Sequence, residues 1–506
     1  MKTYQDLVEE LEKKDEKDLK QWIRAFIGEY MQSDMYETAV DAEEYYKKRN
    51  TTIVKYEKML TTVTGRVIPD EYSANHKVCS GFFKRFVTDQ VGFSLGNGVS
   101  FDGDDTKEAL GGIKFDKAVQ KAGKWACIGG VSYGFWNNDH VEVFKAKEFA
   151  PLLDEQTGAL RSGVKFWQLS YDKPLRAILF EEDGFTEYMW DDEHTDGEVV
   201  TKKTAYIRVE TKSEKDGTID IEWKNYPAFP IVPLWANEER QSELVGIKEG
   251  IDAYDLIKNG FENDLDEAQL YWVIRGAGGM DDPDLARFME RLRRNKVAAP
   301  GDGQEIQPVT VQIPYDARER LLDRLENDLY RDFMITNTDR IASGAVTATQ
   351  IEASYKPQDS KADDFEYQIG EFIEAVMALA GVEDTFGFER GYVINKTEMI
   401  QNTLAAAQYF PQDYTIKKLL TLLGDGDMAD GIIEQMKQEE IERMREQEAM
   451  MGGVEDMEGT EGMTGEEEGM EEAPEEDQEG AEGAAIDEYS NDVMEMLESL
   501  LKELGE

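Results

Sequence analysis

The sequence predicts an α+β fold, in which an antiparallel β region is joined to a framework of long helices. The apolar residues between Trp125 and Trp235 follow a period of two, which is typical of strands with one solvent-facing side. Two long amphipathic helical patterns follow within residues 237–334, on either side of a short insertion broken by Gly and Pro. With 506 residues, 40% of them hydrophobic, the chain can bury a sizeable core, and its length favours about three domains.

The N-terminal part is predicted to be helical. Residues 5–49 carry two apolar patterns of helical spacing, with Ser33 and Asp34 as caps between them. A further helix is expected within residues 75–101, ending at a Gly-Asn-Gly turn at 96–98. Nucleotide binding at these glycines is disfavoured, because Phe101 breaks the G-x-G-x-x-G spacing and no Walker-type motif is present. The apolar face of this helix is Val78, Phe82, Phe86 and Val87.

The β region contains a clear hairpin signal and then a stiff connection. An Asp216-Gly217 turn precedes Ile219, Ile221 and Trp223, which alternate with polar residues. The region ends in a Pro-rich run at 227–233, which leads into the first long helix.

Each of the two long helices has an apolar stripe. Mixed charges occupy the other faces of the second helix, as on a solvated helix. An ordinary helical hairpin in a globular core is an equally good interpretation of the pattern. The first stripe is Leu244, Ile247, Ile251, Tyr254, Phe261 and Leu265, and the second is Leu321, Leu322, Leu325, Leu329 and Phe333.

The insertion between the helices predicts a small α/β unit. Two β-like runs, 270–274 and 306–313, enclose a basic cluster. These cations suit contact with phosphate, but a solvated face paired with Glu290 is the more frequent arrangement. The cluster is Arg287, Arg291, Arg293, Arg294 and Lys296.

Residues 335–359 predict a polar loop with Gly344 and Pro357, in which a new helix starts near 347–350. Helices resume at 365–379 and 396–423. Residues 455–488 contain 16 acidic and no basic side chains, which predicts disorder. The last residues form a short amphipathic pattern that either packs on the body or docks to a partner.

Composition limits the classes of function. The net charge of −51 argues against sequence-independent wrapping of nucleic acid around the protein. Two cysteines, Cys79 and Cys127, are too few for a disulfide framework and predict free thiols in a reducing compartment. Neither a signal peptide nor a membrane-spanning run is expected. Only the acidic tract at 191–196, with His194, has residues suited to metal binding, and an acidic hairpin tip is the favoured interpretation, so no enzyme, metal or cofactor is predicted.

The order of parts across residues 20–425 resembles the portal proteins of long-tailed bacteriophages. Three stretches carry the resemblance: NHKVCSGFFKRFVTDQVGFSLGNGVSF at 75–101, FPIVPLWANEERQSELVGIKEGIDAYDLIKNGFENDLDEAQLYWVIRG at 229–276, and ITNTDRIASGAVTATQIEASYKPQDSKADDFEYQI at 335–369. The Gly/Glu/Met-rich C-terminal tract departs from the family pattern.

The resemblance implies a homo-oligomeric ring, a dodecamer in the capsid, at the one vertex through which double-stranded DNA enters and leaves. It implies packaging, retention and ejection of the genome, with DNA passing without sequence specificity. The implied partners are the terminase large subunit, a head–tail adaptor, and the major capsid and scaffolding proteins, in a virion assembled in the host cytoplasm. An acidic wall with a few spaced cations suits a channel in which DNA must slide.

The resemblance also implies a layout and a set of site residues. The layout is a wing at 1–236, stem helices at 237–265 and 317–334, a clip at 266–316, a tunnel loop and the start of a tunnel helix at 335–359, wing or crown helices at 360–395, a helical crown at 396–451, a disordered acidic tract at 452–488 and a short amphipathic helix at 489–506. The expected DNA-channel residues are Asn337, Arg340, Ser343, Gly344, Thr347, Gln350 and Lys356, the expected subunit-interface residues are Leu244, Ile247, Ile251, Tyr254, Leu325 and Leu329, and the clip cluster is Arg291, Arg293, Arg294 and Lys296.

Two other classes of protein remain compatible with the sequence. One is an acidic cytosolic scaffold or adaptor that binds partners through the helical hairpin. The other, which the sequence supports less, is a metal-dependent hydrolase that uses the 191–196 tract. A ring with a central hole would favour the portal interpretation over both the scaffold and the hydrolase.

Overall fold

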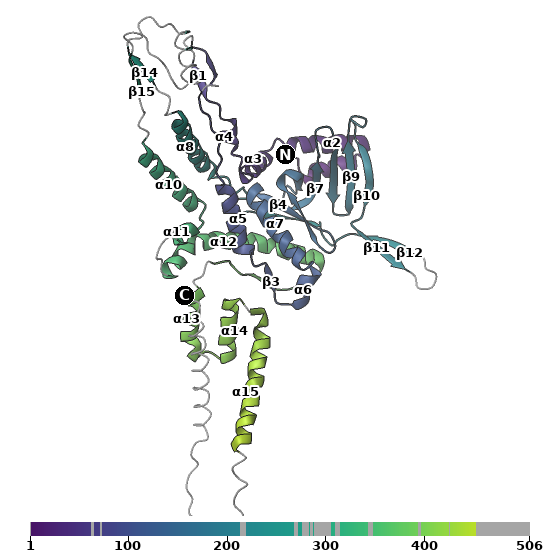
Figure 1. The fold of residues 1–506 in the computed structure, drawn as a ribbon. Coiled ribbons are helices and arrows are strands. Elements are labelled where there is room, and N and C mark those ends of the chain that lie inside the picture. Colours follow the sequence, from purple (N-terminus) through teal and green to yellow (C-terminus); the bar gives the residue numbers. More distant parts are fainter. Residues whose placement is uncertain are drawn as a thin grey trace, which may run out of the picture. The chain divides into compact units, whose positions relative to one another are not determined.

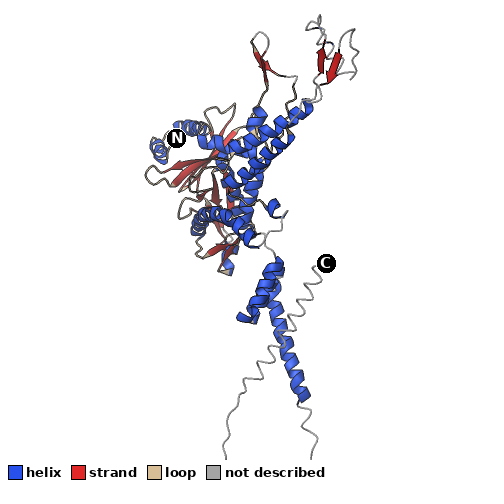
Figure 2. Cartoon of the chain, turned by 90° about the vertical axis from the view of Figure 1, so that its left-hand side faces the viewer, coloured by secondary structure: helices blue, strands red, loops and turns tan. Residues whose placement is uncertain are grey.

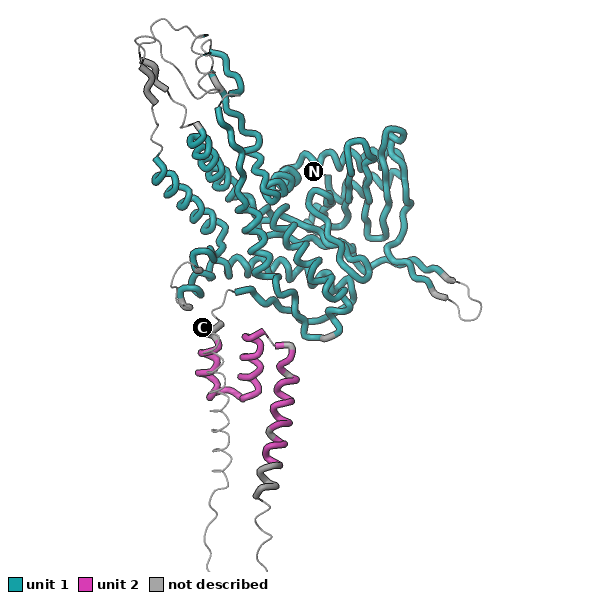
Figure 3. Tube along the Cα trace, viewed as in Figure 1, with its two compact units in different colours: residues 1–392 teal, residues 393–506 magenta. Residues whose placement is uncertain are grey.

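The computed structural model describes residues 2–61, 65–70, 73–212, 219–267, 272–275, 305–308, 314–342, 348–392, 396–424 and 426–451, with single positions at 283 and 287. The chain divides into two compact units, residues 1–392 and 393–506, which are coloured separately in Figure 3. Helices and strands are both abundant in the first unit, as predicted for an α+β fold, whereas the described part of the second unit is helical.

A five-stranded antiparallel sheet with strand order β10-β9-β8-β7-β6 forms one layer of the first unit (Figure 1). Two N-terminal helices cover it because their apolar stripes, including Ile23 and Phe26, pack on inward-facing strand residues such as Val164 and Leu179. The elements are α1 (Tyr4–Glu12), α2 (Glu16–Tyr30), β6 (Phe149–Leu153), β7 (Leu160–Trp167), β8 (Leu175–Glu181), β9 (Gly184–Trp190) and β10 (Glu198–Thr204).

A three-stranded sheet with order β13-β4-β5 and a set of helices around it form the largest core. Gly130 ends α7 with φ +84, and a Cβ there would lie 3.0 Å from the backbone of Gln241 and Ser242, so only glycine allows this close approach. The elements are α3 (Asp34–Tyr46), α5 (Phe82–Leu95), α7 (Ile113–Gly129), β4 (Val131–Trp136), β5 (Val141–Lys145), η1 (Ala146–Glu148), β13 (Ile231–Trp235) and α12 (Ala348–Ala380).

Smaller elements complete the first unit. Among the described residues, two-stranded antiparallel ladders pair β1 with β2, β3 with β16, β11 with β12, and β14 with β15. The strand pairing predicted on either side of the Asp216-Gly217 turn is confirmed, and the turn itself lies outside the described residues. The β-like runs expected at 270–274 and 306–313 overlap two described strands, which pair with each other, while 270–271 and 309–313 lie outside the described residues. The elements are α4 (Thr51–Lys55), β1 (Met59–Thr61), β2 (Val67–Pro69), β3 (Val99–Phe101), α6 (Asp104–Ala109), β11 (Ile207–Lys212), β12 (Ile219–Lys224), β14 (Trp272–Arg275), β15 (Glu305–Pro308), α11 (Thr338–Ala342) and β16 (Phe386–Phe388).

Two long helices, α8 (Lys248–Glu267) and α10 (Tyr315–Asp332), lie side by side (Figures 1 and 2). The ring of Phe261 packs edge-on against Tyr315, with centroids 5.6 Å apart, and Arg318 pairs with Asp264. At the other end, a Cβ on Gly250 would lie 2.9 Å from Leu329, which lets the helices approach closely. The expected first helix is shorter than the sequence suggested, because turns occupy 243–247.

Three buried polar residues on α8, Asp255, Asn259 and Asn263, form a polar ladder. Asn263 accepts a hydrogen bond from the backbone N–H of His76 at 2.7 Å, Asn259 from that of Val78 at 2.7 Å, and Asp255 from that of Ser80 at 2.9 Å. Asn259 also donates to the carbonyl of Val78 at 2.8 Å. The side chains of one helix thus bind residues 76–80 as a neighbouring strand would.

The polar ladder corrects one prediction. Residues 75–81 are not helical, and α5 begins only at Phe82, so Val78 is not part of the expected helical face.

A second correction concerns residues 5–30, where one expected helix is divided into α1 and α2 by a turn at Lys14, which has φ +55. The Ser33 cap and the end of α5 before the 96–98 turn are confirmed.

In the described part of the second unit, residues 396–424 and 426–451, three α-helices follow one another along the chain. The contacts between them include an ion pair of 2.6 Å from Lys437 to Asp413, and Leu419 is buried. The acidic tract and the final amphipathic pattern lie outside the described residues. The elements are α13 (Lys396–Ala406), η2 (Ala407–Tyr409), α14 (Gln412–Leu423), η3 (Gly426–Met428) and α15 (Ala429–Met451).

Candidate functional site

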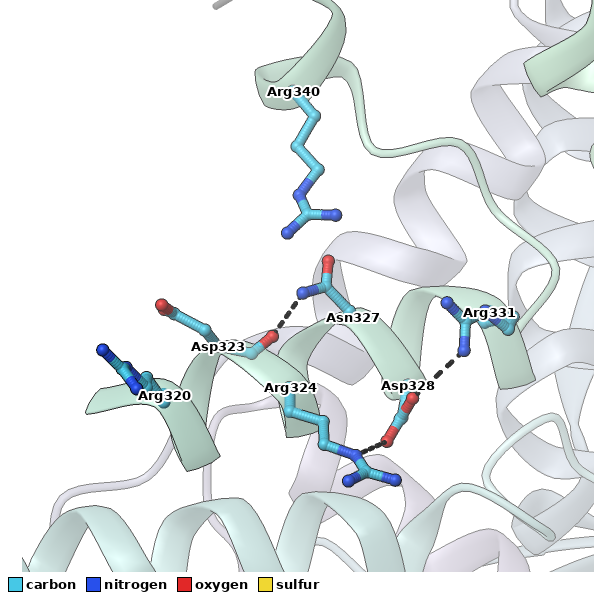
Figure 4. A pocket seen from close by; sticks show the side chains of 7 residues that line it. All are labelled: Arg320, Asp323, Arg324, Asn327, Asp328, Arg331 and Arg340. Atoms are coloured by element: carbon cyan, nitrogen blue, oxygen red, sulfur yellow. Dashed lines mark hydrogen bonds and ion pairs between the residues drawn. The ribbon is translucent and has the colours of Figure 1, made fainter. Parts of the chain in front are cut away.

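The outward face of α10 and the adjacent α11 form an arginine groove of about 420 Å³ (Figure 4). Four guanidinium groups and two carboxylates line it, an excess of two positive charges in a chain whose net charge is −51. The lining residues are Arg320, Asp323, Arg324, Asn327, Asp328, Arg331 and Arg340.

Helical spacing places the charged residues of the arginine groove on one face of α10, because residues three or four apart are neighbours on a helix surface. Arg324 lies 3.6 Å and Arg331 3.3 Å from the carboxylate of Asp328 (Figure 4). Both guanidinium groups remain open to solvent, with side chains 80% and 77% exposed. One carboxylate shared by two exposed arginines leaves much of their hydrogen-bonding capacity for an anion.

A contact between α11 and α5 positions the fourth arginine. Arg85 of α5 donates to Asp339 of α11 at 2.8 Å, and its guanidinium lies 5.4 Å from the ring centroid of Tyr330 on α10. The hydrogen bond to the carboxylate of Asp339 raises the pKa of Arg85. Arg340, one residue further along, points from α11 toward Asn327 (Figure 4). The arginine groove thus joins two elements that are separate in the sequence.

Of the residues expected to line the DNA channel, the structure describes four. Arg340 lies in the arginine groove, and Gln350 and Lys356 are exposed on α12. Asn337 is half-buried, and its side-chain oxygen has no hydrogen-bond partner. Ser343, Gly344 and Thr347, and the clip cluster Arg291, Arg293, Arg294 and Lys296, lie outside the described residues.

The residues expected at a subunit interface are mostly covered within the subunit itself. Leu244, Ile247, Ile251 and Leu329 belong to the largest core and are between 1% and 4% exposed. These four side chains are therefore covered within the subunit, as in a helical hairpin that packs in a globular core, and their expected contact with a neighbouring subunit stays a prediction. The half-buried Tyr254 and Leu325 are not fully covered, so contact with a neighbour stays a prediction for them.

Sequence reasoning missed Arg320, Arg324 and Arg331 as site residues, because it assigned them to a solvated helix face. Their i, i+4 and i+11 positions were a usable signal, since these offsets return to similar sides of a helix.

The fold and this site define a protein of mixed helices and strands with a charged binding surface. Within the described residues, no group of three or more His, Cys, Asp or Glu side chains could hold a metal ion, and no helix is both long and apolar enough to cross a membrane. The candidate site contains no paired nucleophile and base of the kind that catalysis uses.

Comparison with known proteins gives the family. The model of the phage portal proteins that are SPP1 Gp6-like matches residues 32–453. A portal protein of Clostridium phage phiCD119 is 20% identical over 73% of this chain and 84% of its own, and the portal protein of Bacillus phage SPP1 is 24% identical over 64% of this chain and 66% of its own. A chain from the neck of an empty gene transfer agent particle has a TM-score of 0.36, at 10% identity, covering 68% of this chain and 90% of its own.

The chain belongs to the SPP1 Gp6-like family of phage portal proteins. It is a subunit of the portal ring at the head–tail connector of a phage particle, and its role is structural rather than enzymatic. The expectation drawn from the sequence resemblance is thereby confirmed for the family and for this function.

Proposed function

We propose that the ring encloses the channel for double-stranded DNA and that Arg320, Arg324 and Arg340 of the arginine groove contact its phosphates transiently. The observation that carries the proposal is the local positive excess on an otherwise acidic chain. Arginine is suited to phosphate because its planar fork donates two hydrogen bonds at once. Three arginines per subunit, spaced apart, guide a sliding duplex without the tight hold of a continuous basic surface.

The finer layout belongs to the same proposal. Residues 1–236 form the wing, α8 and α10 the stem, 266–316 the clip, 335–359 the tunnel segment with Gly344, and 396–451 the crown. The ring in the capsid is a dodecamer. It binds the terminase large subunit, a head–tail adaptor, and the major capsid and scaffolding proteins. The pairing of the long helices and the position of Arg340 beside one of them support this layout.

Replacing Arg320, Arg324 and Arg340 together by glutamine is expected to weaken DNA contact without disturbing the subunit. A plot of log affinity against log salt concentration has a negative slope, and each phosphate contact contributes about 0.9 to its magnitude. The loss of three contacts is therefore expected to make the slope shallower by roughly 2 to 3. The measurement is binding of a labelled duplex to purified rings at several salt concentrations, with the DNA retained per particle as a second readout.

The matched control replaces three exposed lysines of α7, Lys114, Lys117 and Lys121, by glutamine. This change removes the same charge from another face of the first unit. The triple arginine variant is expected to alter the salt slope and the control to leave it nearly unchanged. Equal effects would show that only net charge matters and would contradict the assignment of the arginine groove to the channel.

A further inference from the structure

Five lysines of the first unit, the lysine patch, lie where the helices α3, α5 and α7 meet β5 and η1 (Figure 1). Acidic residues outnumber basic ones by 107 to 56 in the whole chain, so this grouping of cations departs from the composition. The described carboxylates that form ion pairs with the patch are those of Glu43, Glu44 and Glu148, which leaves a local excess of positive charge. The lysine patch is Lys47, Lys84, Lys124, Lys145 and Lys147.

One half of the lysine patch already holds a carboxylate, that of Glu43, whose side chain is 8% exposed. This carboxylate lies 2.7 Å from the ammonium of Lys147, 2.9 Å from that of Lys47 and 3.7 Å from that of Lys145. Burial acts to raise the pKa of Glu43, but the hydrogen bonds from Lys147 and Lys47 outweigh burial, so the pKa lies below its ordinary value. The chain itself thus shows that these lysines bind a carboxylate in its charged form.

The other half of the patch holds its ammonium groups beside aromatic rings. Lys84 of α5 lies 5.9 Å and Lys124 of α7 lies 4.8 Å from the ring centroid of Tyr46. The ammonium of Lys124 also lies 5.1 Å from the ring centroid of Trp125, and Lys145 lies 3.9 Å from the same ring. A cation attracted to a ring loses part of its rotamer freedom, so less ordering is needed when an anion binds.

The two lysines beside Tyr46 differ from those around Glu43 in one respect. Among the residues that the structure describes, no carboxylate lies within ion-pair distance of Lys84 or Lys124. Two positioned ammonium groups therefore stand next to a filled carboxylate site without carboxylates of their own.

We infer that Lys84 and Lys124 bind two carboxylates of a short acidic peptide segment that belongs to another protein of the phage particle. A lysine presents a compact charge that suits a carboxylate oxygen, as at Glu43, whereas bidentate binding of phosphate favours the planar fork of arginine. A portal ring at the head–tail connector is joined to other proteins, and most of this acidic chain repels an acidic partner. The inference goes beyond the channel proposal and does not depend on it, since the lysine patch shares no residue with the arginine groove.

The test is binding of a fluorescein-labelled ten-residue polyglutamate peptide to the purified full-length protein, measured by fluorescence anisotropy. The salt concentration is about 0.15 M, at which charges more than about 8 Å apart are largely screened. The double variant Lys84→Gln with Lys124→Gln is expected to weaken binding roughly tenfold, because it removes two ion pairs. The matched control, Lys114→Gln with Lys117→Gln, removes the same charge from exposed lysines elsewhere on α7 and is expected to change the affinity less than about twofold.

Tyr46→Leu tests the aromatic support without changing any charge. Both ammonium groups lose the ring that positions them, so binding of the polyglutamate peptide is expected to weaken about threefold. The melting temperature of each variant is measured as well, so that unfolding is not counted as lost binding. Wild-type affinity in the folded Tyr46→Leu variant would contradict the inference, because the two lysines would then act as ordinary solvated charges.

Three other results would overturn the inference. Equal weakening in the α7 control would show that net charge alone attracts the peptide. A DNA duplex that binds more tightly than the peptide, and that depends on Lys84 and Lys124, would make phosphate the ligand. A gain in peptide affinity of at least about tenfold on deletion of residues 452–488 would make the acidic tract of this chain the occupant. The arginine groove is unchanged in every variant, so the channel proposal stands in each case.

Discussion

Replacing Ile251 by aspartate is expected to destabilise the separate subunit by about 3–5 kcal/mol, since the change places an uncompensated carboxylate in a core. Ile251 is 2% exposed and belongs to the largest core of the first unit, together with Leu244, Ile247 and Leu329. The measurement is denaturant unfolding of subunits kept below the concentration at which rings form. A large drop in the midpoint is the expected result.

Leu256→Asp is the matched control on the same helix. Leu256 is 47% exposed in the single chain, so the new carboxylate stays in water and the subunit should keep its stability within about 0.5 kcal/mol. The pair of variants separates two roles of α8. If Ile251→Asp left the subunit stable and prevented only ring formation, Ile251 would face a neighbour, as the family resemblance implies.

Asn259→Leu is expected to release residues 76–80 from α8. The substitution leaves both the N–H and the carbonyl of Val78 without their partners, which are now at 2.7 and 2.8 Å, at a cost of about 1–3 kcal/mol for each group that stays dry. Hydrogen exchange resolved to single amides is the measurement. The amide of Val78 should exchange at least about tenfold faster, since each 1.4 kcal/mol of lost protection corresponds to a factor of ten.

Asn263→Leu tests whether the polar ladder acts rung by rung. Within the part of the chain that the structure describes, Asn263 accepts a hydrogen bond from the amide of His76, so faster exchange should be confined to that end of the segment. Uniform release of residues 76–80 by either variant would show a single cooperative unit instead. Unchanged exchange in both variants would mean that the hydrogen bonds of the ladder contribute little to holding the segment.

Apolar periodicity was sufficient to predict most of the fold. The stripe of α2 and the alternating strands before Trp235 occur where the spacing of apolar residues indicated, and the described strands β14 and β15 overlap the two β-like runs expected in the insertion. These elements bury one regular face, and that face is visible in the sequence because local geometry fixes its period. Chain composition also indicated correctly that the two cysteines are free.

The missed features depend on contacts between distant parts of the chain. Val78 lies four residues before Phe82, which suggests a helical face, yet the buried Asp255 and Asn259 bind residues 76–80 in an extended conformation instead. Nothing in the local sequence states that polar residues on α8 are buried, because polar residues at such positions usually face water. The burial of Ile251 inside the subunit was missed for the same reason, since it depends on which elements cover the helix.

The candidate site was predicted only in part. Arg340 was selected from the family resemblance, and the structure places it beside three arginines that the sequence assigned to a solvated face. Their grouping requires α11 to lie against α10, and the ion pair of Arg85 with Asp339 contributes to that position. Since this pair joins residues more than two hundred positions apart, spacing along the chain could not reveal it.

The polar ladder also sets a limit on its own length. Four residues of helix advance about 6.0 Å, whereas two residues of extended chain advance about 6.6 Å, and each rung turns about 40° further around the helix. Over the two intervals from Asp255 to Asn263 the two repeats drift apart by roughly 1 Å and 80°. The side chain of a fourth residue in this series would point away from the segment. The repeat of the helix and the repeat of the extended chain therefore match over three positions and no further. Inserting or deleting one residue in α8 between these positions would rotate the remaining rungs by about 100° and disengage them, which makes this stretch of the helix intolerant of length change even where its side chains could vary.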